Sequence, residues 1–183
     1  MFDRDVFTQA CAAAVMGADP ERAVRELVGE AVADPSVVAT ALGAPEHAGL
    51  VTLLRSPTVT VLDVNWAPWM SLKPHNHCMW SVIGLYAGRE DNVFWRRTPA
   101  GIEAAGARSL GPRDVTVLGR DIIHSILNPI GRRTRAIHVY GGDFFAPPEP
   151  RAEWDPETLR ERPWDLEDTR RIFASAEARA RHG

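Results

Sequence analysis

The spacing of hydrophobic positions divides the chain into three regions. In residues 1–48, apolar side chains recur at helical spacing between Val24 and Val32, and the preceding Asp19-Pro20 is typical of a helix N-terminus. A second short helix is predicted to begin at Asp34-Pro35. This first region is therefore expected to be helical and to pack on the part of the chain that follows.

From residue 49 to residue 145 the pattern changes to short runs rich in β-branched and aromatic residues, with turn residues between them. Such runs, with no helical pattern between them, predict a mainly β fold built as an antiparallel sandwich or barrel. The predicted strands are Leu50–Arg55, Thr58–Trp66, Met79–Tyr86, Asn92–Arg97, Ile102–Ser109, Val115–Leu118, Ser125–Asn128 and Arg135–Tyr140.

Residues 146–183 form a C-terminal extension. A proline-rich stretch opens it, and a helical pattern over Asp165–Ala180 follows. A chain of 183 residues has the length of one domain with its own core. We therefore expect the helical segment 1–48, the barrel 49–145 and the extension 146–183 to make up a single domain.

The composition is typical of a soluble globular protein. A net charge of −3 and a hydrophobic fraction of 45% are ordinary values, and no basic cluster indicates a nucleic-acid surface. No apolar stretch is long enough to span a bilayer, and the N-terminus lacks the apolar core of a signal peptide. With only Cys11 and Cys78, a disulfide framework is not expected. These features favour a cytoplasmic protein that binds neither nucleic acid nor membranes.

Three histidines lie in two short segments of β-patterned sequence: His75 and His77 in the first, and His124 in the second. A strand sends alternate side chains to one face, so His75 and His77 share a face. His124 from a partner strand would complete a set of three nitrogen ligands and leave other metal positions open, as catalytic metal sites do. Three neutral imidazoles suit Fe, Zn, Cu or Ni. The alternative is a set of hydrogen-bonded barrel histidines that hold no metal.

The two segments resemble the two motifs of the cupin superfamily. The first cupin motif has His-x-His, then a Glu and, after six more residues, a Gly; here Ser81 stands where the Glu is expected, and Gly88 follows. The second motif has a Gly, a His and, after three more residues, an Asn. Gly119, His124 and Asn128 match it, with a gap between Gly and His that is longer by two residues. The resemblance implies a jelly-roll β-barrel.

A three-histidine site without the Glu resembles the thiol dioxygenase branch of the cupins, which includes cysteine dioxygenase. That branch carries Ser-x-His-x-Tyr after the third ligand; here His138 and Tyr140 match, and Ala136 replaces the Ser. By the strand period of two, these three share one face, while Ile137 and Val139 face a core. The resemblance implies one Fe(II) per chain, O₂ as co-substrate, and oxidation of a small thiol such as cysteine or 3-mercaptopropionate to a sulfinate. His138 and Tyr140 would be the catalytic residues.

Residues that bind the substrate are also suggested by the resemblance. The thiol dioxygenases hold the substrate carboxylate with an arginine, and the candidates here are Arg55, before the first histidines, and Arg151, after the last predicted strand. Trp80 flanks the metal motif and is a candidate for the wall of the pocket. Glu90 lies beside the Gly88 turn and is expected at the surface.

Two other functions fit the same residues. One is a three-histidine cupin oxygenase whose substrate is not a thiol, for instance a diketone; the missing hydroxyl at Ala136 keeps this alternative open. The other is a non-catalytic cupin that binds a small ligand as a sensor. The sequence shows no pair of DNA-binding helices, and this disfavours a sensor that regulates transcription. The expected partner is a small molecule, and both a monomer and a homodimer fit the sequence.

Overall fold

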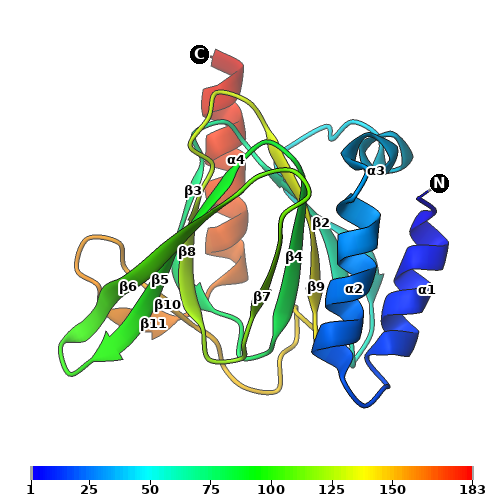
Figure 1. Cartoon of the computed structure of the whole chain (residues 1–183). Helices are drawn as coiled ribbons and strands as arrows, with labels where there is room; N and C mark the ends of the chain where they lie inside the picture. The colour runs from blue at the N-terminus through cyan, green and yellow to red at the C-terminus, as the bar shows by residue number, and fades with distance from the viewer. Residues whose placement is uncertain (1, 183) are drawn as a thin grey trace.

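The computed structural model describes residues 2–182 and contains two antiparallel sheets that face each other (Figure 1). In spatial order, the strands of the first sheet are β1 (Gly49–Arg55), β2 (Thr60–Trp66), β9 (Thr134–Tyr140), β4 (Ser81–Ala87) and β7 (Val115–Leu118). Those of the second sheet are β11 (Glu161–Pro163), β10 (Ala152–Trp154), β3 (Ser71–Asn76), β8 (Ile123–Leu127), β5 (Glu90–Thr98) and β6 (Gly101–Leu110).

Helices pack against this pair of sheets (Figure 1). The N-terminal helices, α1 (Arg4–Ala14), α2 (Pro20–Val32) and α3 (Pro35–Leu42), lie beside the first sheet, and the C-terminal helix is α4 (Leu166–His182). The first three helices each begin after an aspartate whose carboxylate accepts hydrogen bonds from the first turn: Asp3, Asp19 and Asp34. The helix starts predicted at Asp19-Pro20 and Asp34-Pro35 are therefore confirmed.

The prediction of a mainly β fold with N-terminal helices and a C-terminal helix is confirmed, with differences at the strand boundaries. Strand β3 was not predicted as a separate strand, because its sequence is mostly polar, contains Pro74 and lacks a clear alternation of apolar and polar residues. Two short strands, β10 and β11, form within the C-terminal extension. Strand β8 begins at Ile123 rather than at Ser125, which places His124 inside the strand.

The first sheet has an outer face and an inner face. Ile137 and Val139 pack in a buried cluster with the N-terminal helices, whereas Tyr140 belongs to a cluster on the inner side, so the predicted division of β9 into two faces is confirmed. A Cβ at Gly84 would lie only 2.4 Å from a methyl carbon of Val28. Glycine at this position therefore allows α2 to approach the sheet closely.

The space between the sheets is closed on one side by the C-terminal helix. Phe173 and Ala176 of α4 pack in one buried cluster with Leu62 of β2 and Leu72 of β3, which belong to different sheets. Within residues 2–182, no helix has both the length and the apolar composition needed to cross a membrane.

Candidate metal centre

The three predicted ligands meet inside the barrel. His75 lies at the end of β3, directly opposite His124 of β8, and His77 follows one residue after β3 ends. The Nε2 atom of His77 lies 3.2 Å from that of His75 and 3.3 Å from that of His124. All three side chains are buried, and they form the one group of this kind found among the described residues.

Hydrogen bonds on the far side of two rings decide where their protons sit. Nδ1 of His75 lies 2.9 Å from the carbonyl oxygen of Lys73, and Nδ1 of His124 lies 2.8 Å from Oδ1 of Asn92. A carbonyl or amide oxygen accepts only, so each of these Nδ1 atoms carries the proton and donates it. The Nε2 atoms are then bare, which is the state in which an imidazole binds a metal.

Ser81 occupies the position at which the cupin motif has a metal-binding Glu. Ser81 begins β4, and its Oγ lies 3.4 Å from Nδ1 of His77. A serine hydroxyl can orient the ring by hydrogen bonding. It does not supply the fourth, anionic ligand that a Glu would provide.

These donors fit a divalent cation. Burial lowers the pKa of His75 to about 4, and burial followed by the neighbouring histidines lowers the pKa of His77 and of His124 well below the ordinary value. The rings are therefore neutral at pH 7, with bare nitrogen lone pairs facing one another at close range. A metal ion between the lone pairs would turn this repulsion into coordination, and three neutral imidazoles would leave positions free for other ligands.

The predicted catalytic pair lies beside these ligands. Nδ1 of His138 is 3.0 Å from the hydroxyl oxygen of Tyr140, and both side chains are buried on the inner face of β9. The ring of Tyr140 meets that of His77 edge to face, with centroids 5.0 Å apart. Burial raises the pKa of Tyr140, so its hydroxyl keeps its proton. The pair is thus a neutral hydrogen-bonding group at the wall of the site.

Glu90 was expected at the surface, and this prediction is wrong. Its side chain is fully buried: one carboxylate oxygen accepts a hydrogen bond from Nε1 of Trp66 at 2.8 Å, and the other accepts from Nδ2 of Asn92 at 2.9 Å. Burial raises the pKa of this carboxyl to about 7. The physical reason is that β5 begins at Glu90, two residues earlier than predicted, so Glu90 and Asn92 alternate onto the inner face.

Arg151 is the predicted substrate-binding residue that the fold brings to the site. Its guanidinium is buried and packs against the rings of Phe144 and Trp164, at 4.3 Å and 3.5 Å from their centroids. None of its three side-chain nitrogens has a hydrogen-bond partner among the described residues. Burial lowers its pKa to about 10, so it remains a cation. An unpaired buried cation is costly, and this one is therefore suited to receiving an anion.

The other two predicted substrate-binding residues lie elsewhere. Arg55, at the end of β1, is half exposed and forms an ion pair with Asp143 at 2.9 Å, so it does not line the cavity. Trp80 precedes β4 and packs with the cluster under the N-terminal helices, on the outer side of the first sheet. The short hairpin after Arg55 and the turn before Ser81 direct both side chains away from the histidines.

The cavity at the histidines is nearly closed. Its volume is about 20 Å³, little more than a single water occupies, and its walls include His75, His77 and Tyr140. Phe144, which follows β9, and Trp164 and Phe173 of the C-terminal extension also belong to the walls. Sequence reasoning missed these three residues, because isolated aromatics in a loop and a helix carry no signal of where they pack.

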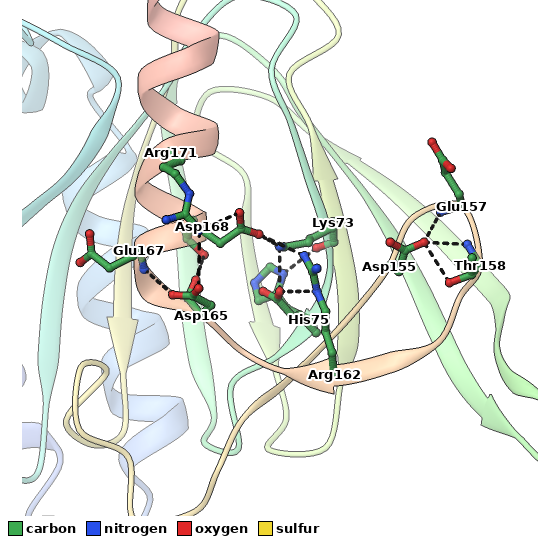
Figure 2. A network of polar contacts seen from close by, with 12 residues as sticks. Lys73, His75, Asp155, Glu157, Thr158, Arg162, Asp165, Glu167, Asp168 and Arg171 are labelled. Atoms are coloured by element: carbon green, nitrogen blue, oxygen red, sulfur yellow. Dashed lines mark hydrogen bonds and ion pairs between the residues drawn. The ribbon is translucent and has the colours of Figure 1, made fainter.

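A network of charged side chains fastens the C-terminal extension to the strand of His75 (Figure 2). Lys73 is nearly buried, and its ammonium pairs with Glu153 of β10 at 2.7 Å and with Asp168 of α4. Arg162 of β11 also reaches Glu153 and Asp168, at 2.8 Å and 3.1 Å. Since the carbonyl of Lys73 holds His75, one residue links the position of a ligand to the extension that covers the site.

Comparisons with known proteins report on the fold alone. No protein-family model matches the chain, and no curated protein matches it. Among solved structures, a conserved protein with a double-stranded β-helix domain from Klebsiella pneumoniae is similar over 67% of this chain and 89% of its own, with 10% identity and a TM-score of 0.44.

Two further structures are similar at the same level. A cupin superfamily protein from Desulfitobacterium hafniense aligns over 58% of this chain and 88% of its own, with 17% identity and a TM-score of 0.46. A DMSP lyase from Ruegeria pomeroyi aligns over 61% of this chain and 54% of its own, with 17% identity and a TM-score of 0.48. Similarities this distant do not bear on the chemistry of the site, which follows from this chain's own residues.

We expect the protein to bind one divalent metal ion per chain. The variant His77→Ala should lose most of its affinity for the metal, because one of the three ligands is removed. His138→Ala is the matched control, since it removes a buried imidazole from the same cavity but outside the ligand set. Elemental analysis of the purified variants measures both. Unchanged metal content in His77→Ala, or loss of metal in His138→Ala, would contradict this assignment.

Proposed function

We propose that the protein is an Fe(II)-dependent dioxygenase that converts a small thiol carrying a carboxylate, such as 3-mercaptopropionate or cysteine, to the sulfinate. The single observation that carries this proposal is the unpaired, buried guanidinium of Arg151, which packs against Phe144 and Trp164 in the wall of the cavity at the histidines. A bidentate contact between arginine and a carboxylate is strong and directional. It would fix one end of the substrate while the other end, the sulfur, faces the histidines.

The identity of the metal rests on the chemistry of the reaction and on the resemblance to thiol dioxygenases. When bound by His75, His77 and His124, Fe(II) would supply open coordination positions and the redox capacity needed to combine a thiolate with O₂. Both oxygen atoms of O₂ end on the sulfur, so the thiol and one O₂ give one sulfinic acid. The residues of the chain bind, orient and shield these reactants.

Tyr140 and His138 support the proposal from the other side of the site. The Tyr140 hydroxyl is held by Nδ1 of His138 at 3.0 Å, and its ring lies edge-on to His77. With its proton donated to Nδ1 of His138, the hydroxyl keeps a lone pair that can accept a hydrogen bond from the thiol of the substrate without first being reoriented. Its raised pKa keeps it neutral, so it adds no negative charge that would compete with the thiolate for the metal.

The closed cavity is consistent with a small substrate. A volume of about 20 Å³ leaves no room for a thiol, so substrate entry requires a side chain such as Phe144, Trp164 or Phe173 to move. Two of these rings, Phe144 and Trp164, also contact the guanidinium of Arg151. Binding of the carboxylate is thereby coupled to the position of the aromatic wall, which would exclude water during the reaction.

One alternative has an observation in its favour. Ala136 leaves no hydroxyl on β9 where thiol dioxygenases carry a serine, so the chain departs from that branch at a residue next to the proposed catalytic pair. A three-histidine oxygenase acting on a carboxylate without sulfur would use Arg151 in the same way. The two functions differ only in the atom that faces the metal.

The test is oxygen uptake by protein loaded with Fe(II) under anaerobic conditions and then given a panel of substrates. We expect consumption of O₂ with 3-mercaptopropionate or cysteine, in equal amount to the sulfinate detected by mass spectrometry. Cysteamine, which lacks the carboxylate, and 3-hydroxypropionate, which lacks the sulfur, are the matched controls. Oxygen uptake with 3-hydroxypropionate, together with none for any thiol of the panel, would support the alternative oxygenase and contradict the thiol dioxygenase.

Arg151→Met should raise the KM for 3-mercaptopropionate about tenfold to a hundredfold, because charge-assisted hydrogen bonds to the carboxylate are lost. Methionine keeps the apolar contacts with Phe144 and Trp164, and the variant should unfold at no lower temperature than the wild type, since a buried unpaired charge is removed. Arg55→Met is the control and should leave KM unchanged. Equal KM values in the two variants would rule out Arg151 as the carboxylate site.

Tyr140→Phe should lower kcat about a hundredfold while the metal content and the circular dichroism spectrum stay as in the wild type, because one positioned hydroxyl is removed. Tyr86→Phe, the other buried tyrosine, lies in the cluster under the N-terminal helices and provides the control. Steady-state oxygen consumption on the best thiol gives the measurement. A Tyr140→Phe enzyme as fast as the wild type would mean that the ring only packs.

A further inference from the structure

We propose that Glu90 is a positioning residue of the metal centre: through Asn92 it fixes the ligand His124, and it also serves as the outer partner of His138. The inference rests on the metal site of the proposed function but not on the identity of the substrate. Neither motif of the sequence includes Glu90, and its burial on β5 is what brings it to the site.

The first arm runs from Glu90 to the ligand. Asn92 donates from Nδ2 to Glu90 at 2.9 Å and accepts at Oδ1 from Nδ1 of His124 at 2.8 Å. An amide has one donor end and one acceptor end, so the carboxylate forces the acceptor end toward the histidine. His124 must then carry its proton on Nδ1 and present a bare Nε2 to the metal. The carboxylate thus sets the tautomer of a ligand that it does not touch.

The second arm faces the catalytic pair. Oε2 of Glu90 lies 3.9 Å from Nε2 of His138, a buried nitrogen with no hydrogen-bond partner among the described residues. Trp66 is the other neighbour on this side, but its N–H already donates to the same Oε2 and has no lone pair to offer. At 3.9 Å the contact is longer than a hydrogen bond, and Glu90 is the one carboxylate within 4 Å of this nitrogen among the described residues.

This arm substitutes for a group that the chain lacks. Ala136, two residues before His138 on the same face, has no hydroxyl to hold the imidazole. With Glu90 as acceptor, the proton of His138 sits on Nε2, and the bare Nδ1 accepts the Tyr140 hydroxyl. The order is carboxylate, imidazole, hydroxyl, the arrangement in which a third group orients the base. The free lone pair of Tyr140 then faces the cavity.

The geometry also determines which of the two contacts of Glu90 would be lost in the isosteric variant Glu90→Gln. Two donors, Trp66 and His138, face Oε2, so in Glu90→Gln the amide oxygen is expected to stay there. The amide nitrogen then faces Nδ2 of Asn92, and two donors cannot pair. Asn92 must rotate and withdraw its oxygen from His124. Asn92→Asp added to this variant restores an acceptor at both contacts, because a carboxylate accepts from the introduced amide and from His124 alike.

The experiment measures Zn(II) affinity by competition with a chromophoric chelator in the full chain. Glu90→Gln should bind Zn(II) about tenfold to a hundredfold more weakly than the wild type, the range for loss of a group that orients a ligand. The double variant Glu90→Gln/Asn92→Asp should recover most of this loss. Asp91→Asn is the control, since Asp91 pairs with Arg89 and alternates onto the face of β5 opposite to Glu90 and Asn92; it should bind like the wild type.

A merely structural Glu90 would give a different pattern. The effects of Glu90→Gln and Asn92→Asp on Zn(II) affinity would then add, and the double variant would bind Zn(II) no better than Glu90→Gln. That result, or Zn(II) affinity in Glu90→Gln equal to the wild type, overturns the first arm. The second arm is read from the nitrogen–proton NMR spectrum of the imidazole rings in Zn(II)-loaded wild type, measured above the pKa of Glu90. A proton on Nε2 of His138 is expected, and one on Nδ1 overturns it.

Failure of this inference and failure of the proposed function are separate outcomes. If the wild type binds no Zn(II), the metal site itself is wrong, and with it the proposed function. If the wild type binds Zn(II) and only the pattern of the Glu90 and Asn92 variants fails, the metal site stands without Glu90. Absence of thiol oxidation changes neither measurement, because both are made without substrate. The wild-type NMR result stands even where a variant does not fold.

Discussion

The register between β3 and β8 is the constraint on which the site depends. It sets His75 directly opposite His124, and the chain then brings His77 to the same face. The pairing shifts by one residue between Leu72 and His75, and without this irregularity the alternation of side chains would turn His75 out of the barrel. The same alternation places Asn92 on the neighbouring β5, within reach of His124, so a ligand and its outer partner follow from a single pattern of pairing.

Burial gives this arrangement its chemical character. Removal from water lowers the pKa of His75 to about 4 and raises that of Glu90 to about 7, so the imidazoles are neutral and the carboxyl can exchange its proton near neutral pH. Elsewhere in the same barrel, a buried charge is fully paired, as Arg135 is with Asp63 at 2.9 Å. Arg151 differs from this structural ion pair, because none of its side-chain nitrogens has a hydrogen-bond partner among the described residues.

The sequence predicts those parts of the site that follow from local pattern. His-x-His and His138-x-Tyr140 each place two side chains on one face of a strand, so both could be recognised without a structure. The barrel and its helices follow from the change in hydrophobic period and from the aspartate caps. Glu90 and the aromatic wall did not follow, because their roles arise from contacts between segments far apart in the chain, for which spacing gives no signal.

Contacts of the C-terminal extension compensate for the unfavourable free energy of burying the unpaired guanidinium of Arg151. A buried guanidinium without a hydrogen-bond partner destabilises the folded chain, and its contacts with Trp164 and Phe144 offset only part of that cost. Elsewhere, the paired charges at Lys73 and the bidentate contact of Arg133 with Glu177, at 2.8 Å, hold the extension in place. Fixed in this way, the guanidinium has no means of reaching water. An anion that enters the cavity therefore gains the hydrogen bonds that folding withheld from Arg151, and part of its affinity comes from relieving the cost of burying that charge unpaired.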